Sequence, residues 1–350
     1  MAAITVTRTI TTPEQLAAAG LISKDGAAAL RPVADRYAVA VTPHIAGLIG
    51  RSDPGDPIAR QFIPSAAELD STPGQRSDPI GDERHSPLKG IVHRYRDRVL
   101  LKLTLICPVY CRFCFRREMV GPGAGQMLSE TETEAALDYI ASHPEIWEVI
   151  LTGGDPLMLS ARRLREVAKR LAAIPHVNVV RWHTRVPIAD PSRVTDAVVA
   201  AIKAAPTAYL VVHVNHPKEL CEVAIRAIAR FIDAGIPVLS QSVLLRGVND
   251  NVATLESLMR VLVAARIKPY YLHHMDLAPG TAHFRTTIAE GRALVASLRR
   301  AVSGLANPQY VLDIPGGYTK AQLAESEVEL NGDSARLRDS HGTWHDYRET

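Results

Sequence analysis

The stretch CPVYCRFCFRR, residues 107–117, holds three of the four cysteines in this 350-residue chain. Cys107, Cys111 and Cys114 have the spacing C-x3-C-x2-C and directly follow the apolar run VLLKLTLI (99–106). Three thiolates on one short loop can hold three irons of a [4Fe–4S] cluster, which leaves the fourth iron open to another ligand. Structural zinc is the main alternative, but it normally takes four protein ligands in two pairs, and the sequence has no second pair. The loop therefore predicts a cluster with one open iron.

The run before the cysteines is the first of several predicted strands. The others lie at 147–151, 177–183, 208–214, 236–244 and 268–274. Amphipathic helical segments separate them, which makes six β/α units in a row. Such alternation predicts parallel strands with right-handed crossovers, and six units favour an open, partial (β/α)6 barrel over a closed eight-stranded one. Functional residues are then expected at the C-terminal strand ends, where the cysteine loop also lies.

Three regions follow from this α/β pattern: a helical and loop region at 1–90, the barrel at 91–286 and a C-terminal segment at 287–350. In the first region, Thr12 is a predicted N-cap with Pro13 at the first helical position. The stretch 52–87 is rich in Pro, Asp, Ser and Gly and predicts an extended loop. Residues 331–350 are expected to form a polar tail.

The composition is that of an ordinary globular chain, with 47% apolar and 22% charged residues and a net charge of +3. There is no basic run or aromatic ladder, so nucleic acid is not an expected partner. No apolar stretch approaches the roughly 18–20 residues that a membrane helix needs, and the N-terminus lacks the apolar core of a secretory signal. We therefore expect no membrane association and a cytoplasmic location, where clustered cysteines bind metal or act in catalysis more often than they form disulfides.

The cysteine spacing after a first strand resembles the signature of the radical S-adenosylmethionine (SAM) superfamily. The resemblance implies that the amino and carboxylate groups of SAM chelate the open iron. The motif LTGGDPL (151–157) is similar to the glycine-rich motif of that superfamily, although a GGDP sequence alone is more often only a turn. A lone histidine is likewise more often structural. The residues that the resemblance places beside SAM are Gly153, Gly154, Asp155, His213, Gln241 and Asn249.

Across 86–320 the chain resembles the lysine 2,3-aminomutase family. The similar motifs are SPLKGIVHRYRDRVLL, CRFCFRR, TGGDPL, VNHP, SQSVLLRGVNDN, DLAPGTAHFRT and DIPGGYTK. The resemblance implies an isomerase that interconverts L-lysine and β-lysine with a [4Fe–4S] cluster, SAM and pyridoxal 5′-phosphate (PLP). Lys320 takes the place of the lysine that binds PLP, which composition alone would assign to a surface loop. The turn before it reads GGYTK, where relatives have only glycines.

The same resemblance assigns further contacts. Arg116 matches the arginine that binds the substrate carboxylate, a task that suits a planar guanidinium. Asp276 and Asp313 match the aspartates that bind the ε-ammonium of lysine, and two carboxylates around one cation make physical sense in a dry site. Arg94, Tyr95 and Arg98 in HRYRDR resemble the group around the PLP phosphate and ring. Taken singly, each of these arginines could be surface charge and each aspartate a turn residue. Arg117 receives no role and is expected to be a solvated charge.

The resemblance also implies a reaction. The reduced cluster cleaves SAM, the resulting 5′-deoxyadenosyl radical takes hydrogen from C3 of lysine, and the amino group moves from C2 to C3. The reduction calls for an electron donor such as flavodoxin or ferredoxin. No cysteine follows Cys221, so the C-terminal structural zinc of larger relatives is not expected. We do expect the protein to form a homo-oligomer. The alternatives are an aminomutase for another amino acid, a lysine aminomutase that serves modification of elongation factor P, and a non-enzymatic iron–sulfur protein.

Overall fold

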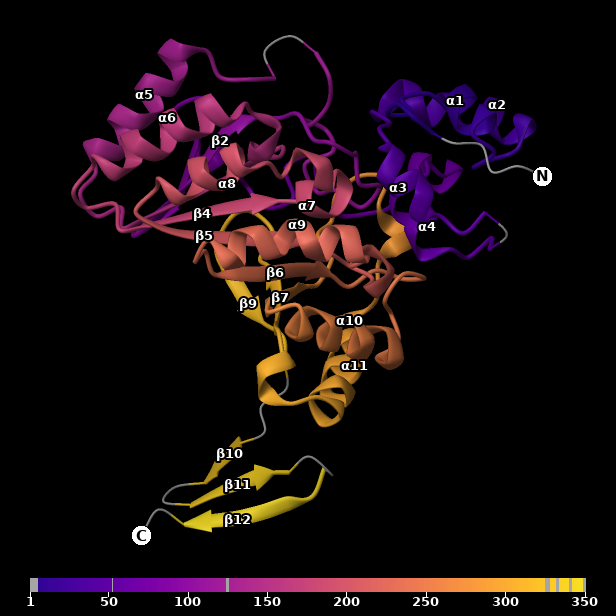
Figure 1. Cartoon of the computed structure of the whole chain (residues 1–350). Helices are drawn as coiled ribbons and strands as arrows, with labels where there is room; N and C mark the ends of the chain where they lie inside the picture. Colours follow the sequence, from indigo (N-terminus) through magenta and orange to yellow (C-terminus); the bar gives the residue numbers. More distant parts are fainter. Residues whose placement is uncertain are drawn as a thin grey trace.

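A nine-stranded sheet forms the centre of the protein, and its strands follow one another in chain order from β1 to β9 (Figure 1). The structure is a computed structural model that describes residues 6–51, 53–123, 126–324, 328–331, 334–339 and 342–348. The strands are β1 (Ile91–Tyr95), β2 (Arg98–Thr104), β3 (Glu148–Gly153), β4 (Val179–Thr184), β5 (Thr207–His213), β6 (Val238–Val243), β7 (Lys268–His273), β8 (Gln309–Asp313) and β9 (Lys320–Gln322). Strands β2 to β8 run parallel, while β1 and β9 pair antiparallel at the two edges. The sheet is therefore not closed into a barrel, which confirms the open α/β architecture.

Helices alternate with the parallel strands and cover the outer face of the sheet (Figure 1). They are α5 (Glu130–Ala141), α6 (Ala161–Ala172), α7 (Val186–Ala189), α8 (Asp196–Lys203), α9 (Glu222–Asp233), α10 (Val252–Ala264) and α11 (Ile288–Ala301). Local sequence sets several of their starts. In α5, for example, the Ser129 hydroxyl accepts the Glu132 N–H while the Glu132 carboxylate accepts the Ser129 N–H, which satisfies two donors at the helix end. None of the described helices has the length and apolarity that a bilayer span requires.

Strand alternation separates the core from the concave side of the sheet. In β3, Val149 and Leu151 pack into the main hydrophobic core, whereas Ile150 and Thr152 line a cavity. In β4 the core residues are Val180 and Trp182, and the cavity residues are Arg181 and His183. Successive side chains of a strand point to opposite faces, so the helices bury one set and leave the other facing the interior of the open barrel.

The N-terminal region contains α1 (Pro13–Ala18), α2 (Lys24–Arg36), α3 (Pro43–Leu48) and α4 (Pro57–Phe62). The predicted start of α1 is confirmed, because the Thr12 hydroxyl accepts the Gln15 N–H. The prediction of an extended loop at 52–87 is wrong in part. Asp56 caps α4, and the stretch also holds the 3₁₀ turns η1 (Ala66–Leu69) and η2 (Glu83–His85). One of its prolines, Pro57, stands at the start of α4 rather than in a loop, a role that composition does not reveal.

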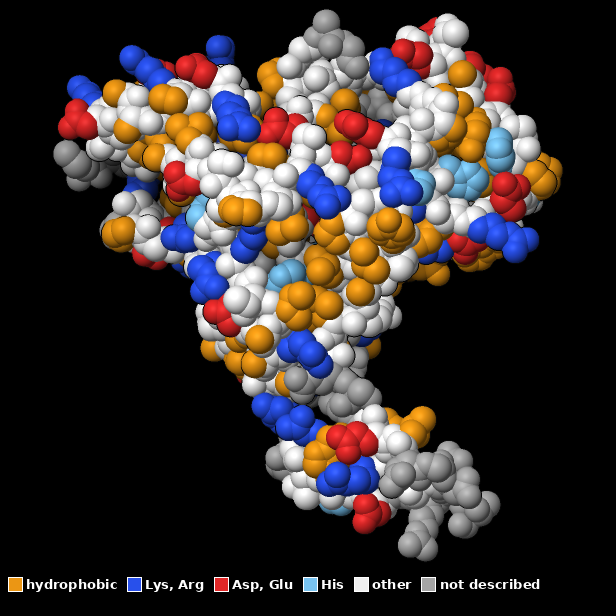
Figure 2. Space-filling view, turned by 180° about the vertical axis from the view of Figure 1, so that it is seen from behind, with side chains coloured by type: hydrophobic (Ala, Val, Ile, Leu, Met, Phe, Trp, Pro, Cys, Tyr) orange, Lys and Arg blue, Asp and Glu red, His pale blue; other side chains and the backbone are white. Residues whose placement is uncertain are grey.

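The C-terminal residues form structure that the sequence did not predict. Instead of a polar tail, they make a three-stranded antiparallel sheet of β10 (Val328–Asn331), β11 (Ser334–Arg338) and β12 (Trp344–Arg348). Its strands are short and mostly polar, so their alternation was too weak to recognise. Figure 2 shows this small sheet at the lower end of the molecule, and above it a surface on which basic and acidic side chains are interspersed.

Candidate active site

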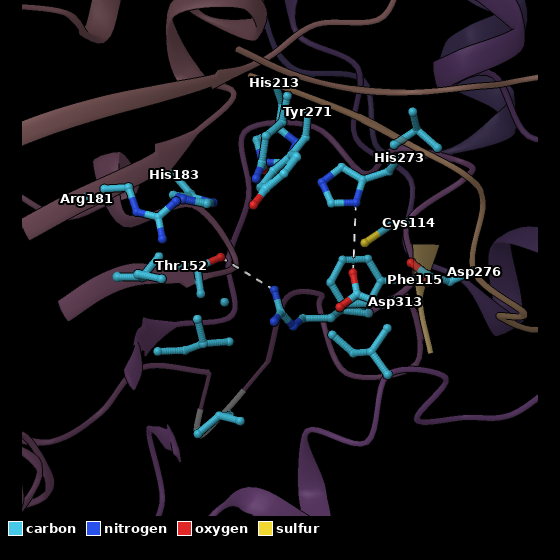
Figure 3. A pocket seen from close by; sticks show the side chains of 18 of the residues that line it. Cys114, Phe115, Thr152, Arg181, His183, His213, Tyr271, His273, Asp276 and Asp313 are labelled. Carbon is cyan, nitrogen blue, oxygen red and sulfur yellow. Dashed lines mark hydrogen bonds and ion pairs between the residues drawn. The ribbon is translucent and has the colours of Figure 1, made fainter. Parts of the chain in front are cut away.

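A cavity of about 650 Å³ occupies the concave side of the sheet. All but one of the predicted site residues line it; they are Arg94, Tyr95, Arg98, Cys107, Cys111, Cys114, Arg116, Gly153, Gly154, Asp155, His213, Gln241, Asp276, Asp313 and Lys320. They come from both edges of the sheet and from most strands between. Figure 3 shows His273, Asp276 and Asp313 on one side of this cavity and Arg181 and His183 on the other.

The three cysteines lie on the loop after β2 and are free thiols. Burial is the main reason that the pKa of each is raised, to about 11 for Cys111. Within the described part of the chain, no three His, Cys, Asp or Glu side chains converge on a position for a single metal ion. A cluster presents a separate iron to each thiolate, so its ligands need not converge on one ion. The donor set suits a cluster, whose irons must displace the thiol protons on binding.

Buried ion pairs fix this loop on both sides of Cys114. Arg112 donates from Nε to Glu68 Oε1 at 3.0 Å and from Nη2 to Oε2 at 2.5 Å. Arg117 also pairs with Glu68, donates to the Gly280 carbonyl at 2.8 Å and stacks on an aromatic ring. The prediction that Arg117 is a solvated charge is therefore wrong, because its side chain is only 4% exposed. Glu68, from the N-terminal region, pairs with both guanidinium groups and offsets one of their two positive charges.

The glycine motif after β3 packs against the start of the cysteine loop. Gly153 has a φ of +114°, and a Cβ there would lie 2.8 Å from the Thr104 carbonyl oxygen. At Gly154 a Cβ would lie 2.5 Å from the Ile106 carbonyl oxygen. Both positions thus require glycine for close backbone approach between β2 and β3. Asp155 ties this turn to β4, because its carboxylate accepts the Thr184 hydroxyl at 2.7 Å and three backbone N–H groups.

Not all of the polar residues that the sequence predicted beside SAM line the cavity. Gln241 and His213 line the cavity, and burial, followed by the charges of Arg185, His273 and Arg116, lowers the pKa of His213 to about 3. Asn249 does not line it. Its side-chain oxygen accepts the Leu245 N–H at 2.8 Å and its amide donates to two carbonyl oxygens at 2.9 Å. Asn249 therefore holds the loop after β6 in shape and has no cavity-facing group for a direct contact.

Lys320 begins β9 at the edge of the cavity. Its Nζ donates to the Asp313 carboxylate at 2.7 and 2.5 Å, and it lies 6.0 Å from the Tyr271 ring centre. Antiparallel pairing of β8 and β9 sets Asp313 directly opposite Lys320. The turn between them needs its two glycines, because Gly316 and Gly317 have φ of +95° and +79°.

Arg116 reaches into the cavity from the cysteine loop. Its Nε and Nη2 each lie 2.9 Å from Asp82 Oδ2, and Nη1 lies 3.4 Å from the Thr152 hydroxyl. A guanidinium has five N–H groups, so these contacts leave two for a ligand. Sequence reasoning missed Asp82, because it lies in the stretch assigned to an extended loop.

The HRYRDR residues form two separate arrangements. Arg94 bridges two acids, with Nη2 3.4 Å from Asp82 and Nη1 3.3 Å from Asp313. Arg98 instead stacks on the Tyr95 ring at 3.8 Å and pairs with its neighbour Asp97 at 2.6 Å. Arg94 therefore belongs to the charged centre of the site, while Tyr95 and Arg98 form part of the cavity wall.

Asp276 is an acid of the cavity whose pKa lies near neutral pH. Burial, with the negative charge of Asp313 added, raises the pKa of Asp276 from 3.8 to about 7, although Lys320, Arg116 and Arg94 act in the opposite direction. Two acids and a lysine thus share one end of the cavity. The carboxyl of Asp276 is balanced between its neutral and charged forms near neutral pH, and a nearby cation would favour the charged form.

Several cavity residues had no predicted role. Arg181 pairs with Glu148 at 2.6 Å on the wall of the cavity, and the pKa of His183 and of His273 is lowered by burial. Strand parity could have found the two histidines, since His183 is the last residue of one predicted strand and His273 the penultimate residue of another, both on the cavity face. The Nε2 of His183 and the Nε of Arg94 are buried without a protein partner among the described residues. With five arginines on its wall, the cavity suits an anionic ligand.

Comparison with known proteins relates this chain to radical SAM enzymes and to aminomutases. The model of the Radical SAM superfamily matches residues 101–260. L-lysine 2,3-aminomutase of Clostridium subterminale is 39% identical over 89% of this chain and 75% of its own length. L-lysine 2,3-aminomutase of Escherichia coli is 39% identical over 78% of this chain and 79% of its own. Glutamate 2,3-aminomutase of Clostridioides difficile is 34% identical over 90% and 74%. Among solved structures, a radical SAM methyltransferase from Sphaerobacter thermophilus aligns with 63% of this chain at 19% identity and a TM-score of 0.43.

The fold and the cysteine loop define a radical SAM enzyme. Within that superfamily, the chain belongs to the L-lysine 2,3-aminomutase family. It is therefore an isomerase that uses a [4Fe–4S] cluster and SAM. Because glutamate 2,3-aminomutase is also a relative, the substrate has to be argued from the cavity itself.

Proposed function

We propose that this protein interconverts L-lysine and β-lysine by 2,3-amino migration, with PLP bound to Lys320. The observation that carries the proposal is the pair Asp276 and Asp313 at one end of the cavity. A substrate with a second ammonium group would neutralise them there. Glutamate would instead bring a third carboxylate into this group, and like charges in a buried site repel strongly. The acids thus favour lysine over glutamate.

The charge balance around Lys320 supports a role for this lysine in holding the cofactor. Asp313 is paired with the Lys320 ammonium and with Arg94. Covalent attachment of Lys320 to PLP would change that pairing and leave Asp313 available to a substrate cation. The cavity wall carries Arg94, Arg98 and Arg181, which suit an anionic cofactor. When bound, PLP would hold the migrating amino group, while SAM on the cluster would supply the radical.

The chain itself would then bind and orient the substrate. Arg116 would hold the α-carboxylate and the two aspartates the ε-ammonium. Fixing both ends would select the C3 hydrogen that lies nearest the radical source, which is the positioning that radical chemistry requires. Gln241 and His213 would contact SAM from the strand ends, as Gly153 and Gly154 would from their backbone. Substrate and cofactors that fill the cavity would also exclude water from reactive species.

The proposal is tested by anaerobic reconstitution with iron, sulfide, PLP and SAM, followed by reduction and amino-acid analysis. We expect β-lysine from lysine, 5′-deoxyadenosine on reduction, and transfer of deuterium from C3-labelled lysine into the product pool. Glutamate and arginine serve as parallel substrates. Conversion of glutamate with none of lysine would overturn the substrate, and absence of 5′-deoxyadenosine with every amino acid would overturn the chemistry.

The variant Asp313→Asn refines the test of specificity. It removes one charge from the substrate end but leaves the cysteine loop intact. We expect the KM for lysine to rise at least tenfold, since a buried ammonium loses one of its two counter-charges. The matched control is Asp233→Asn, because Asp233 is exposed and pairs with Arg266 at the surface. An equal effect of the two variants would argue against the assignment of Asp313.

A further inference from the structure

Asp82 is a buried acid to which the proposed function gives no role. Its carboxylate is 1% exposed and lies within ion-pair distance of three cations, which are Arg94 at 3.4 Å, Lys102 at 3.7 Å and Arg116 at 2.9 Å. Burial alone would raise the pKa of Asp82, but these cations hold it below its usual value. Asp82 is therefore a buried anion that gathers positive groups from β1, β2 and the cysteine loop.

The segment that carries Asp82 also contacts the lysine turn. Arg84 donates from Nη1 to the Gly316 carbonyl at 2.7 Å, and His85 Nε2 lies 2.7 Å from the Gly317 carbonyl oxygen. Gly81, with φ of +69°, packs so closely that a Cβ there would lie 2.7 Å from the Gly316 carbonyl carbon. We call residues 81–85 the strap. It touches the carboxylate-binding arginine at one point and the turn before Lys320 at others.

We propose that Asp82 is a positioning residue that orients Arg116 for the substrate carboxylate. This rests on the proposed function, in which Arg116 binds that carboxylate. A single oxygen, Asp82 Oδ2, lies 2.9 Å from both Nε and Nη2, so it bridges one edge of the guanidinium and restricts its orientation. The two N–H groups left over by Asp82 and Thr152 lie on Nη1 and Nη2 and form a fork that matches a carboxylate.

The alternative is that Asp82 competes with the substrate carboxylate for Arg116. Asp82 is itself a carboxylate, and it could weaken ligand binding by neutralising Arg116. The geometry favours positioning for two reasons. Asp82 uses one edge of the guanidinium, and among the described residues only Thr152 accepts from the remaining nitrogen, Nη1. It is also shared with Arg94 and Lys102, so the group of three cations keeps a net positive charge.

The test uses the reconstituted holoenzyme with its cluster oxidised, so that ligands bind without turnover. Equilibrium binding of lysine is compared with that of lysinamide, which lacks the carboxylate. We expect Asp82→Asn to bind lysine about tenfold more weakly and lysinamide within twofold of the unchanged protein. Asp82→Glu, which keeps the charge, should restore part of the loss. Glu83→Gln, an exposed neighbour in the strap, is the matched control and should change neither affinity.

The binding results distinguish a positioning role of Asp82 from competition and from a merely structural role. Tighter lysine binding by Asp82→Asn would show competition and overturn the proposal. Equal weakening of lysine and lysinamide would show a merely structural role and would also overturn it. If Asp82→Asn does not fold, the same comparison made with Asp82→Glu decides, because a displaced carboxylate should weaken lysine selectively. If the unchanged protein itself binds lysine and lysinamide equally, the assignment of Arg116 in the proposed function fails instead.

Discussion

Replacing Glu68 by Gln should loosen the cysteine loop, because among the described residues Glu68 is the acid that pairs with two buried arginines of that loop. Its carboxylate is fully buried, and it accepts from Arg112 at 3.0 and 2.5 Å and from Arg117. The two arginines stand on either side of Cys114 in the sequence. Glutamine has nearly the same shape but no charge, and its NH₂ group would point a donor at donors.

The loss of stability in Glu68→Gln follows from the removal of one buried charge. Removing one partner of a buried ion pair costs about 3–5 kcal/mol, because the other charge stays buried without compensation. For a chain larger than 250 residues, about 2 °C of Tm is lost for each kcal/mol. The expected decrease in Tm is therefore about 6–10 °C. The iron content after reconstitution should fall with it, since the ligand loop would be less ordered.

The assay is thermal unfolding under anaerobic conditions, together with iron and sulfide analysis. Glu14→Gln is the matched control, because Glu14 pairs with Arg31 at 2.7 Å on the exposed surface and should have no measurable effect. Asp138→Asn offers a second control in an exposed helix position. If Glu68→Gln keeps both the Tm and the iron content of the unchanged protein, the account of Glu68 as the neutralising anion is refuted.

Three further outcomes follow from the same contacts. Lys320→Ala should abolish the visible absorbance of bound PLP while iron content stays unchanged, and retained absorbance would exclude Lys320 as the attachment site. Asp276, with a pKa of about 7 against 3.8 in the unfolded chain, contributes stability that is present at acid pH and lost as pH rises through about 7. The Tm should therefore fall more between pH 4 and 7 in the unchanged protein than in Asp276→Asn, and parallel curves would contradict the shift. Gly81→Ala should lower PLP occupancy because its Cβ would meet the lysine turn, whereas Gly235→Ala has the same positive φ but no atom within 4 Å and should not.

Much of the fold could be predicted because its signals are local. Strands β2 to β7 lie within a few residues of their predicted positions, since apolar runs and amphipathic helices report periodicity directly. The two antiparallel edge strands were not predicted as such, because β1 and β9 are short and depend on their neighbours for pairing. The C-terminal sheet was missed for the same reason.

Only part of the candidate site could be predicted from the sequence. The cysteine loop, Lys320 and the two aspartates could be named from spacing and resemblance. Asp82 and Glu68 could not, because each acts through partners that are distant in sequence: Asp82 lies 34 positions before Arg116 and Glu68 lies 44 before Arg112. In a Pro- and Asp-rich stretch, nothing local distinguishes a buried anion from a solvated one. Arg117 shows the converse, since a residue expected in solvent is held inside the protein.

The sequence by itself determined the chemistry that depends on spacing. Three thiols on one loop, alternating strands and a lysine after a glycine turn are local patterns, and strand parity alone places His183 toward the cavity and Trp182 toward the helices. Only the tertiary structure decided which charges meet. The strap brings Asp82 against Arg116 and the lysine turn, and η1 brings Glu68 against Arg112. Electrostatic partners are set by distance and burial, and both exist only once the N-terminal region packs across the open barrel.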